Sequence, residues 1–341
     1  MRRILIDDKL TQLVEEYSQQ LFCNRNCNFD QPVTRLGRLL FFLRMKGYDR
    51  RFSDYIDNLR YHYKSILKLK PDDFDVWQRD YFSFLNEPDM HLEIEVENND
   101  DDKIYKLPVC KRPFNEWVIW AMRYDELREK EIIPYLKKLG INSCVYCNAQ
   151  YVVTLEDVIV EDGITKKWVA LYQLDHFWPK SKFPFLCTTF LNLHPSCANC
   201  NLHKGNRDGY FQLYTDNESE LNPLWFELRP EKIIDGVYGY KAENINIKLC
   251  GHNDTLKNKH QEYFLIEDIY KHHRKEVEET IVKLQFNDAS YRRQLQKSLE
   301  ELFPEGVESP ERFFWGHEME EDKVHERPFN KLVQDVVKFV K

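Results

Sequence analysis

The sequence predicts an α+β fold that is mostly helical, with a small group of strands near the middle of the chain. Apolar residues recur at helical spacing in residues 1–90 and 113–139, and again in 259–302 and 328–341. The alternation of apolar and polar residues that is typical of strands is concentrated in residues 150–174. Two CxxC pairs flank this strand region, so we expect a metal site beside it.

Length and composition set broad limits on this protein. The 341 residues are 42% hydrophobic, which is enough for a substantial core in two or three compact units. The sequence contains no run of 18 apolar residues, and the N-terminus MRRILIDDKL lacks the apolar centre of a secretory signal. We therefore expect a soluble, cytoplasmic protein with no membrane partner. Nine cysteines are few for a secreted disulfide scaffold, and a reducing compartment favours metal binding by the paired ones.

The charge is unevenly distributed along the chain. The net charge of −8 alone would argue against binding to nucleic acid. Residues 25–70, however, contain eleven Lys and Arg against four Asp and Glu, whereas 93–102 and 318–322 are acidic. A basic patch and solvated acidic surfaces can coexist on one protein, so the net charge excludes no function class.

Helical periodicity and its stop signals define the N-terminal elements. Four leucines of RLGRLLFFLRMKG share one face, and Gly47 closes the segment: Leu36, Leu39, Leu40 and Leu43. A second apolar face falls within 113–139: Phe114, Trp117, Val118 and Ala121. We expect Pro134 to start a new helix and Gly140 to end it.

Strands and domain boundaries follow from the remaining patterns. Residues 91–107 predict a short hairpin or loop with an acidic turn, NNDDD. Two strands, YVVTLEDVIV and KWVALYQL, are expected around an Asp162-Gly163 turn, and an irregular stretch follows residue 210. We predict three units: a helical N-terminal domain for partner or substrate binding (1–139), a core (140–210) and a mostly helical C-terminal region (211–341).

The two cysteine pairs predict a structural zinc site. Cys144 and Cys147 form one CxxC unit, and Cys197 and Cys200 form the other, with 49 residues between the two units. Each CxxC turn places two thiolates at the separation of tetrahedral ligands, so four sulfurs leave no open position on the metal. A redox dithiol is the alternative for one isolated pair, but two pairs around one loop favour zinc.

Chemically useful residues lie between and beside these pairs. Asp175 and His176 follow an apolar run, and Asp175 offers a hard oxygen ligand suited to Mg²⁺ or Mn²⁺. In a regular strand these two neighbours point to opposite sides. We therefore expect a break in the strand that aims both side chains at the same bound group.

A short helix is expected to follow, beginning at Pro195-Ser196 with Ser196 as its N-cap. Helical spacing then places four residues on one face: Cys197, Cys200, Asn201 and Lys204. His203 falls on the opposite face. One helix can therefore hold zinc and also present an amide oxygen and a lysine.

The ordered set DH…N…CxxCN…K resembles the HNH (ββα-metal) endonuclease family with a zinc knuckle. The resemblance covers about 140–210 and implies a ββα-metal core. It implies that Asp175 and Asn201 are the ligands of a catalytic Mg²⁺ or Mn²⁺. It also implies that His176 is the general base and that Asn192 holds the loop by hydrogen bonds to its backbone. An Asn at the last position is similar to the HNH domains of RNA-guided CRISPR nucleases, and an amide oxygen favours Mg²⁺.

The resemblance also suggests substrate and partner. Four basic residues are expected along the phosphate path: Lys180, Lys182, Lys204 and Arg207. The run DHFWPKSKFPFLCTTFLNLHPSCANCNLHKG is more loosely similar to the HNH nucleases of Septu-type anti-phage defence systems, which implies an ATPase partner. We thus expect a metal-dependent endonuclease that cuts DNA to leave 5′-phosphate ends. A non-cleaving zinc-ribbon scaffold and an RNA-cutting nuclease are the alternatives, and the oligomeric state is open.

Overall fold

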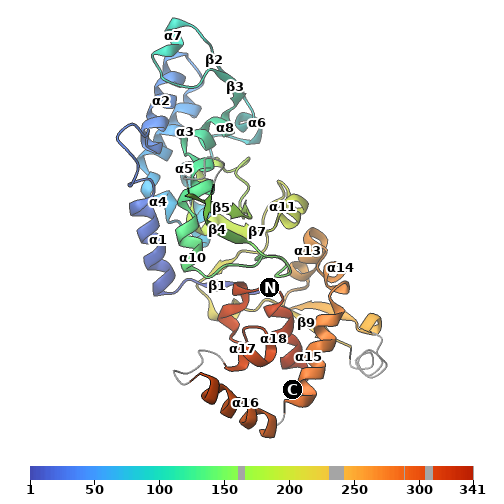
Figure 1. Cartoon of the computed structure of the whole chain (residues 1–341). Coiled ribbons are helices and arrows are strands. Elements are labelled where there is room, and N and C mark those ends of the chain that lie inside the picture. Colours follow the sequence, from blue (N-terminus) through green and yellow to red (C-terminus); the bar gives the residue numbers. More distant parts are fainter. Residues whose placement is uncertain (160–165, 230–241, 288, 304–309, 341) are drawn as a thin grey trace.

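The computed structural model describes residues 1–159, 166–229, 242–287, 289–303 and 310–340. The described chain forms an elongated molecule in which N-terminal helices occupy one end and C-terminal helices the other (Figure 1). The strands within residues 153–196 lie between these two ends (Figure 1). This is a mostly helical α+β arrangement, and its small sheets each contain two strands.

The N-terminal end is helical, as the periodicity predicts. Its helices are α1 (Asp8–Gln20), α2 (Pro32–Met45), α3 (Arg50–Tyr61), α4 (Tyr63–Leu67), α5 (Phe74–Tyr81), α6 (Glu87–Met90), α7 (Asp100–Lys103), α8 (Phe114–Ala121), α9 (Tyr124–Glu126) and α10 (Ile133–Lys138). Pro134 stands in the first turn of α10, where a missing N–H costs nothing, and Gly140 follows the helix at φ +66°. The predicted apolar faces of α2 and α8 are buried.

The strands form five separate pairs. Strand β1 (Ile4–Leu5) runs parallel to β8 (Tyr214–Thr215). The other four pairs are antiparallel: β2 (Glu93–Val96) with β3 (Cys110–Pro113), β4 (Val153–Ile159) with β5 (Lys166–Leu171), β6 (Gln173–His176) with β7 (Leu193–Ser196), and β9 (Leu224–Leu228) with β10 (Ile247–Gly251). The predicted hairpin of β4 and β5 is confirmed, whereas its Asp162-Gly163 turn lies outside the described residues.

The remaining helices surround the C-terminal end. They are α11 (Ala198–Lys204), α13 (Asp254–Phe264), α14 (Ile266–Lys271), α15 (Arg274–Phe286), α16 (Ala289–Leu302), α17 (Pro310–Trp315) and α18 (Asn330–Val340). Shorter helical turns complete the described elements: 3₁₀ turns at Pro71–Asp73, Pro184–Leu186, Phe190–Asn192, Glu218–Glu220, Ala242–Asn244 and Glu321–Glu326, and a π-helical turn at Leu127–Glu131.

Two local expectations from the sequence are wrong. The acidic run NNDDD is not a turn, because Asn99 caps α7 by accepting a hydrogen bond from the Asp102 N–H at 2.7 Å. The expected hairpin itself does form, since β2 pairs antiparallel with β3, but it extends to Pro113, beyond residue 107. The stretch after residue 210 is also more regular than expected, since it contains β9 and β10.

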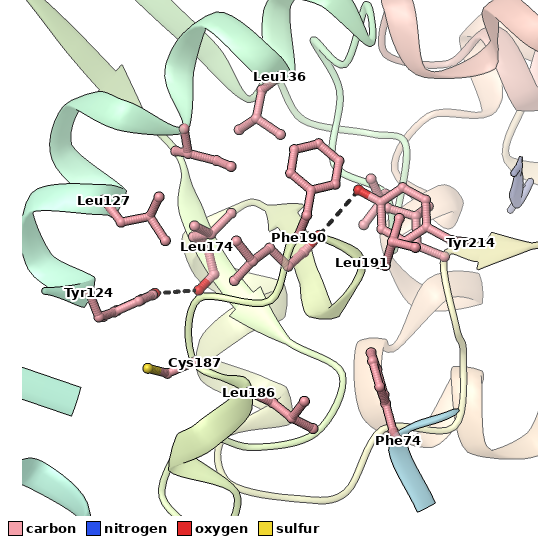
Figure 2. Close-up of a cluster of buried hydrophobic side chains, with 14 of the residues drawn as sticks. Phe74, Tyr124, Leu127, Leu136, Leu174, Leu186, Cys187, Phe190, Leu191 and Tyr214 are labelled. Carbon is pink, nitrogen blue, oxygen red and sulfur yellow. Dashed lines mark hydrogen bonds between the residues drawn. The ribbon is translucent and has the colours of Figure 1, made fainter. Parts of the chain in front are cut away.

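One hydrophobic core connects the two ends of the molecule. Leu36, Leu174 and Val336, one from each of the three predicted units, belong to a single cluster of buried residues. The boundaries at 139 and 210 therefore stay predictions. Figure 2 shows the part of this core beside β6, where Leu174 lies among Leu127, Leu136 and Phe190. Burial of each such side chain contributes about 1.5–3 kcal/mol to the stability of the fold, so β6 lies on a stable hydrophobic core.

Candidate functional site

The four paired cysteines converge on one buried point. Cys144 and Cys147 lie between α10 and β4, and Cys197 and Cys200 lie at the start of α11. Their sulfur atoms all fall within 4.8 Å of one another. Four sulfurs at about 2.3 Å from a tetrahedral zinc stand about 3.8 Å apart, so the cluster has the size of a zinc site. All four residues are buried, which suits a structural site.

Backbone amides support the same interpretation. The Ala149 N–H donates to Cys147 Sγ at 3.5 Å, and the Cys200 N–H donates to Cys197 Sγ at 3.5 Å. Such bonds stabilise the thiolate form that binds metal. The chemistry of the donor set therefore fits structural zinc, as the two CxxC pairs predict.

Asn148, directly after Cys147, connects the turn of the first CxxC pair (the zinc knuckle) to the C-terminal region by hydrogen bonds. Its backbone has φ +49°, a left-handed conformation that Asn tolerates better than most residues. Its side-chain amide donates to Ser143 Oγ at 2.7 Å and to the Val324 carbonyl at 2.9 Å, and its oxygen accepts from the Lys331 N–H at 2.9 Å. The sequence analysis missed this residue, although an Asn after a CxxC is a signal for such a turn.

Pairing of β6 with β7 sets the positions of Asp175 and His176. Asp175 lies opposite His194, and His176 lies opposite Leu193, in one regular register. The expected break between Asp175 and His176 is therefore wrong, because both residues belong to the same paired strand. Their side chains contact different groups, as strand alternation requires.

The Asp175 carboxylate is held from both sides. Tyr146 donates its hydroxyl proton to Oδ2 at 2.5 Å, and Lys204 donates from Nζ to Oδ1 at 3.1 Å. Asp175 is 6% exposed, and burial raises its pKa from the ordinary value while Lys204 acts in the opposite direction. The site thus contains a buried ion pair.

His176 is oriented by a backbone carbonyl. Its Nε2 lies 3.0 Å from the Cys187 oxygen, which can only accept, so Nε2 carries the proton and Nδ1 is left unprotonated. Burial lowers the pKa of His176 well below its ordinary value. Its ring lies 5.0 Å from the ring of Tyr124, whose hydroxyl donates to the Leu174 carbonyl (Figure 2). The neutral ring has the protonation state that a base needs.

Asn192 joins the two ends of the loop between β6 and β7. Its side-chain oxygen accepts from the Trp178 N–H at 2.8 Å. Its amide donates to the Leu186 carbonyl at 3.0 Å and to the Trp178 carbonyl at 3.2 Å. Asn192 is fully buried, so these bonds fix the loop that follows His176. The role that the resemblance assigns to Asn192 in a nuclease site stays a prediction.

Helix α11 presents the predicted face but begins one residue later. Pro195 and Ser196 are part of β7, and Cys197 is the N-cap, so the expectation of a Ser196 cap is wrong. Strand pairing with β6 extends the chain through Ser196 and delays the helix. Cys200 and Lys204 are buried, Asn201 is half-buried and His203 is exposed, in agreement with the helical spacing.

The four basic residues of the predicted phosphate path differ in surroundings. Lys204 is 2% exposed and also donates to the His176 carbonyl at 2.7 Å, so it lies inside the protein. Lys182 pairs with Asp208 at 3.2 Å. The Arg207 guanidinium lies 3.8 Å from the centre of the Tyr263 ring and pairs with Glu262. The Lys180 ammonium lies 5.1 Å from the Tyr124 ring that His176 also contacts.

Ion pairs neutralise much of the basic stretch at 25–70. Its partners come from both inside and outside the stretch, as in Arg25–Glu131, Arg35–Glu126, Arg38–Asp30, Arg44–Asp57, Lys46–Asp102 and Lys68–Glu15. The excess of Lys and Arg in the linear sequence therefore does not produce an equally basic surface.

Tyr146 and His194 are further residues that the sequence analysis left out of the site. Tyr146 stands between the two cysteines of the first pair, and its hydroxyl also lies 3.1 Å from His194 Nδ1. His194 Nε2 lies 2.9 Å from Gln212 Oε1, and burial lowers the pKa of His194 to about 3. A tyrosine between the two cysteines of a CxxC pair has the pattern of an ordinary core residue. Only the fold shows that Tyr146 contacts Asp175.

The fold and the site define a mostly helical α+β protein with small two-stranded sheets and a buried four-cysteine cluster. Part of the chain is similar to Septu protein PtuB from Bacillus thuringiensis, with 33% identity over 79 residues. The match covers 22% of this chain and spans 25% of the length of that protein, so the link is distant and partial. No family model and no solved structure matches the chain. Among the described helices, none has the length and apolar character to cross a membrane.

Proposed function

We propose that this protein is a zinc-stabilised HNH endonuclease that uses one divalent cation to hydrolyse DNA. The observation that carries the proposal is the arrangement of β6, β7 and α11 over the four-cysteine cluster. Lys204 of α11 donates to Asp175 Oδ1 and to the His176 carbonyl, so the strand that carries the acid and the imidazole lies against the helix that bears Asn201. A zinc scaffold that only binds a partner has no need of this buried acid and neutral imidazole.

The oxygen donors available suit a hard cation. Asp175 and Asn201 would hold Mg²⁺ or Mn²⁺, which prefers oxygen ligands and keeps several waters. The hydrogen bonds that Asp175 accepts from Tyr146, Lys204 and the His176 backbone leave part of its lone-pair capacity free, since a carboxylate has about four acceptor sites. Asn201 is half-buried, and no hydrogen bond to its side chain occurs within the described part of the chain. When bound, the cation would neutralise charge on the phosphate and on the leaving oxygen.

The protein groups account for the other requirements of hydrolysis. The free Nδ1 of His176 would take a proton from the attacking water, because the Cys187 carbonyl fixes the proton on Nε2. Lys180, close to the same Tyr124 ring, is placed to attract the phosphodiester. Lys182 and Arg207 would add weaker attraction, since each already pairs with a carboxylate. Lys204 would act through Asp175, with which it is paired inside the protein.

We also propose a biological role for this protein. The similarity to Septu protein PtuB supports a place in anti-phage defence. On the Septu-type resemblance, we propose that an ATPase partner controls cleavage. The helical segment 1–139 would serve for partner or substrate binding.

The decisive experiment compares cleavage with and without Mg²⁺ in zinc-loaded protein, because EDTA would also remove zinc. Supercoiled plasmid, single-stranded DNA and RNA are tested, alone and with candidate ATPase partners. His176→Ala should lower the cleavage rate by about 10²–10⁴-fold, the usual contribution of a general base. His203→Ala, on the exposed side of α11, is the matched control and should cleave like the unmodified protein.

Each outcome separates the candidate functions. Cleavage of DNA that needs Mg²⁺ and His176 supports the proposal, and cleavage of RNA alone replaces DNA as the substrate. If the protein binds nucleic acid or a partner but cleaves no substrate with Mg²⁺, the nuclease hypothesis is rejected. The non-cleaving scaffold is then the function that remains.

A further inference from the structure

Tyr146 belongs to the zinc knuckle and also contacts the proposed cation ligand. It stands between Cys144 and Cys147 in the sequence, yet its hydroxyl reaches Asp175 Oδ2 at 2.5 Å. An O–H···O bond of this length is characteristic of a charge-assisted hydrogen bond to a carboxylate. Tyr146 is 2% exposed, so this bond is shielded from water. The knuckle therefore contacts Asp175 directly through this side chain.

The Tyr146 side chain is itself held in place. Its ring stacks on Phe264 at 4.3 Å between centroids, with 21° between the planes. Its backbone carbonyl lies 2.8 Å from His260 Nε2 and accepts a hydrogen bond from it. Phe264 and His260 both belong to α13. Because α13 fixes the ring and the backbone, the hydroxyl has a fixed position relative to the carboxylate.

The second cysteine pair reaches the same carboxylate from the other side. Lys204, on the helix that carries Cys200, donates to Asp175 Oδ1 at 3.1 Å. Each of the two segments that carry a cysteine pair thus contributes one side chain that contacts Asp175, Tyr146 at Oδ2 and Lys204 at Oδ1. With Oδ2 bonded to the Tyr146 hydroxyl and Oδ1 bonded to Lys204 of α11, the carboxylate is fixed in one rotamer.

We propose that Tyr146 is a positioning residue that couples the structural zinc site to the catalytic cation by fixing the orientation of the Asp175 carboxylate. This inference rests on the proposed function. Partners that orient a metal-binding group from outside the ligand set typically change metal affinity by 10–100-fold when they are removed. A zinc site that holds such a partner contributes to cation affinity as well as to folding.

The test measures cation binding in the absence of substrate. Mn²⁺ affinity of zinc-loaded protein is determined by electron paramagnetic resonance and calorimetry for the unmodified chain, Tyr146→Phe and Tyr270→Phe. Tyr146→Phe keeps the ring stack and removes only the hydroxyl. Tyr270→Phe is a matched control, because its buried hydroxyl donates to the Cys147 carbonyl at 2.7 Å, on the same knuckle but away from Asp175. Asp175→Asn verifies that the measured Mn²⁺ occupies this site.

Tyr146→Phe should bind Mn²⁺ about 10–100-fold more weakly, with unchanged zinc content, while Tyr270→Phe binds it normally. Cleavage by Tyr146→Phe should recover at high Mg²⁺ concentration, which a purely structural defect would not allow. Equal Mn²⁺ affinity in Tyr146→Phe and the unmodified chain overturns the inference and leaves the proposed nuclease standing. An unmodified chain that binds no Mn²⁺, or binds it equally after Asp175→Asn, overturns both.

Discussion

The buried pair of Lys204 and Asp175 gives the sharpest prediction about stability. Replacing Lys204 with Met keeps the aliphatic stem but removes the ammonium group, together with its bonds to Asp175 Oδ1 at 3.1 Å and the His176 carbonyl at 2.7 Å. The two side chains are 2% and 7% exposed, so water cannot replace the lost charge. Asp175 would then be a buried acid with only the Tyr146 hydroxyl as a charge-stabilising side-chain partner.

The expected cost follows from this burial. Removing one member of a buried ion pair typically destabilises a protein by about 3–5 kcal/mol, because the remaining charge is left uncompensated. We therefore expect Lys204→Met to lower the free energy of unfolding by about that amount. Lys182→Met is the matched control. It breaks a pair with Asp208, whose side chain is 70% exposed, and should cost less than about 1 kcal/mol.

Urea unfolding followed by circular dichroism, at fixed zinc occupancy, measures both values. The double variant Lys204→Met with Asp175→Asn should be more stable than Lys204→Met alone, since the unpaired charge is gone. A loss below about 1 kcal/mol for Lys204→Met, or no recovery in the double variant, would refute the interpretation of this pair as a buried charge contact.

Two further expectations concern zinc and pH. Cys200→Ser should lose zinc, which metal analysis measures. Because structural zinc binding supplies folding energy, the region around α11 should then unfold and lose its protection from amide hydrogen exchange. Full protection without zinc would contradict this expectation. Burial lowers the pKa of His260 to about 3, so acid favours the unfolded state, which takes up a proton below its ordinary pKa of 6.5. The contribution of His260 should therefore lower the free energy of unfolding by up to about 1.4 kcal/mol per pH unit as the pH falls from 6.5 towards 3. In His260→Gln, the free energy of unfolding should depend less steeply on pH between 6.5 and 5.5. An unchanged slope in urea titrations would rule out this assignment.

Local patterns predicted the parts of the fold that depend on neighbours in sequence. The leucine face of α2, the start of α10 at Pro134 and the two CxxC pairs all express short-range spacing, and the structure confirms them. The face of α11 with Cys200 and Lys204 inside and His203 outside is of the same kind.

The parts that the sequence analysis missed depend on partners far along the chain. Ser196 looked like an N-cap, but pairing with Gln173 keeps it in β7. The basic excess at 25–70 is reduced by acids as distant as Glu131. Nothing local shows that Tyr146 lies beside Asp175, 29 residues away. Periodicity contains no information on which distant side chains will meet.

The bonds of Asn148 have a consequence for protein synthesis. This residue fixes the first knuckle to the carbonyl of Val324 and the N–H of Lys331, 176 and 183 residues further on. A ribosome adds about 5–20 residues per second, so roughly ten seconds or more separate the synthesis of the cysteines from that of their support. During that interval the first CxxC pair exists without the hydrogen bonds that connect Asn148 to the C-terminal segment.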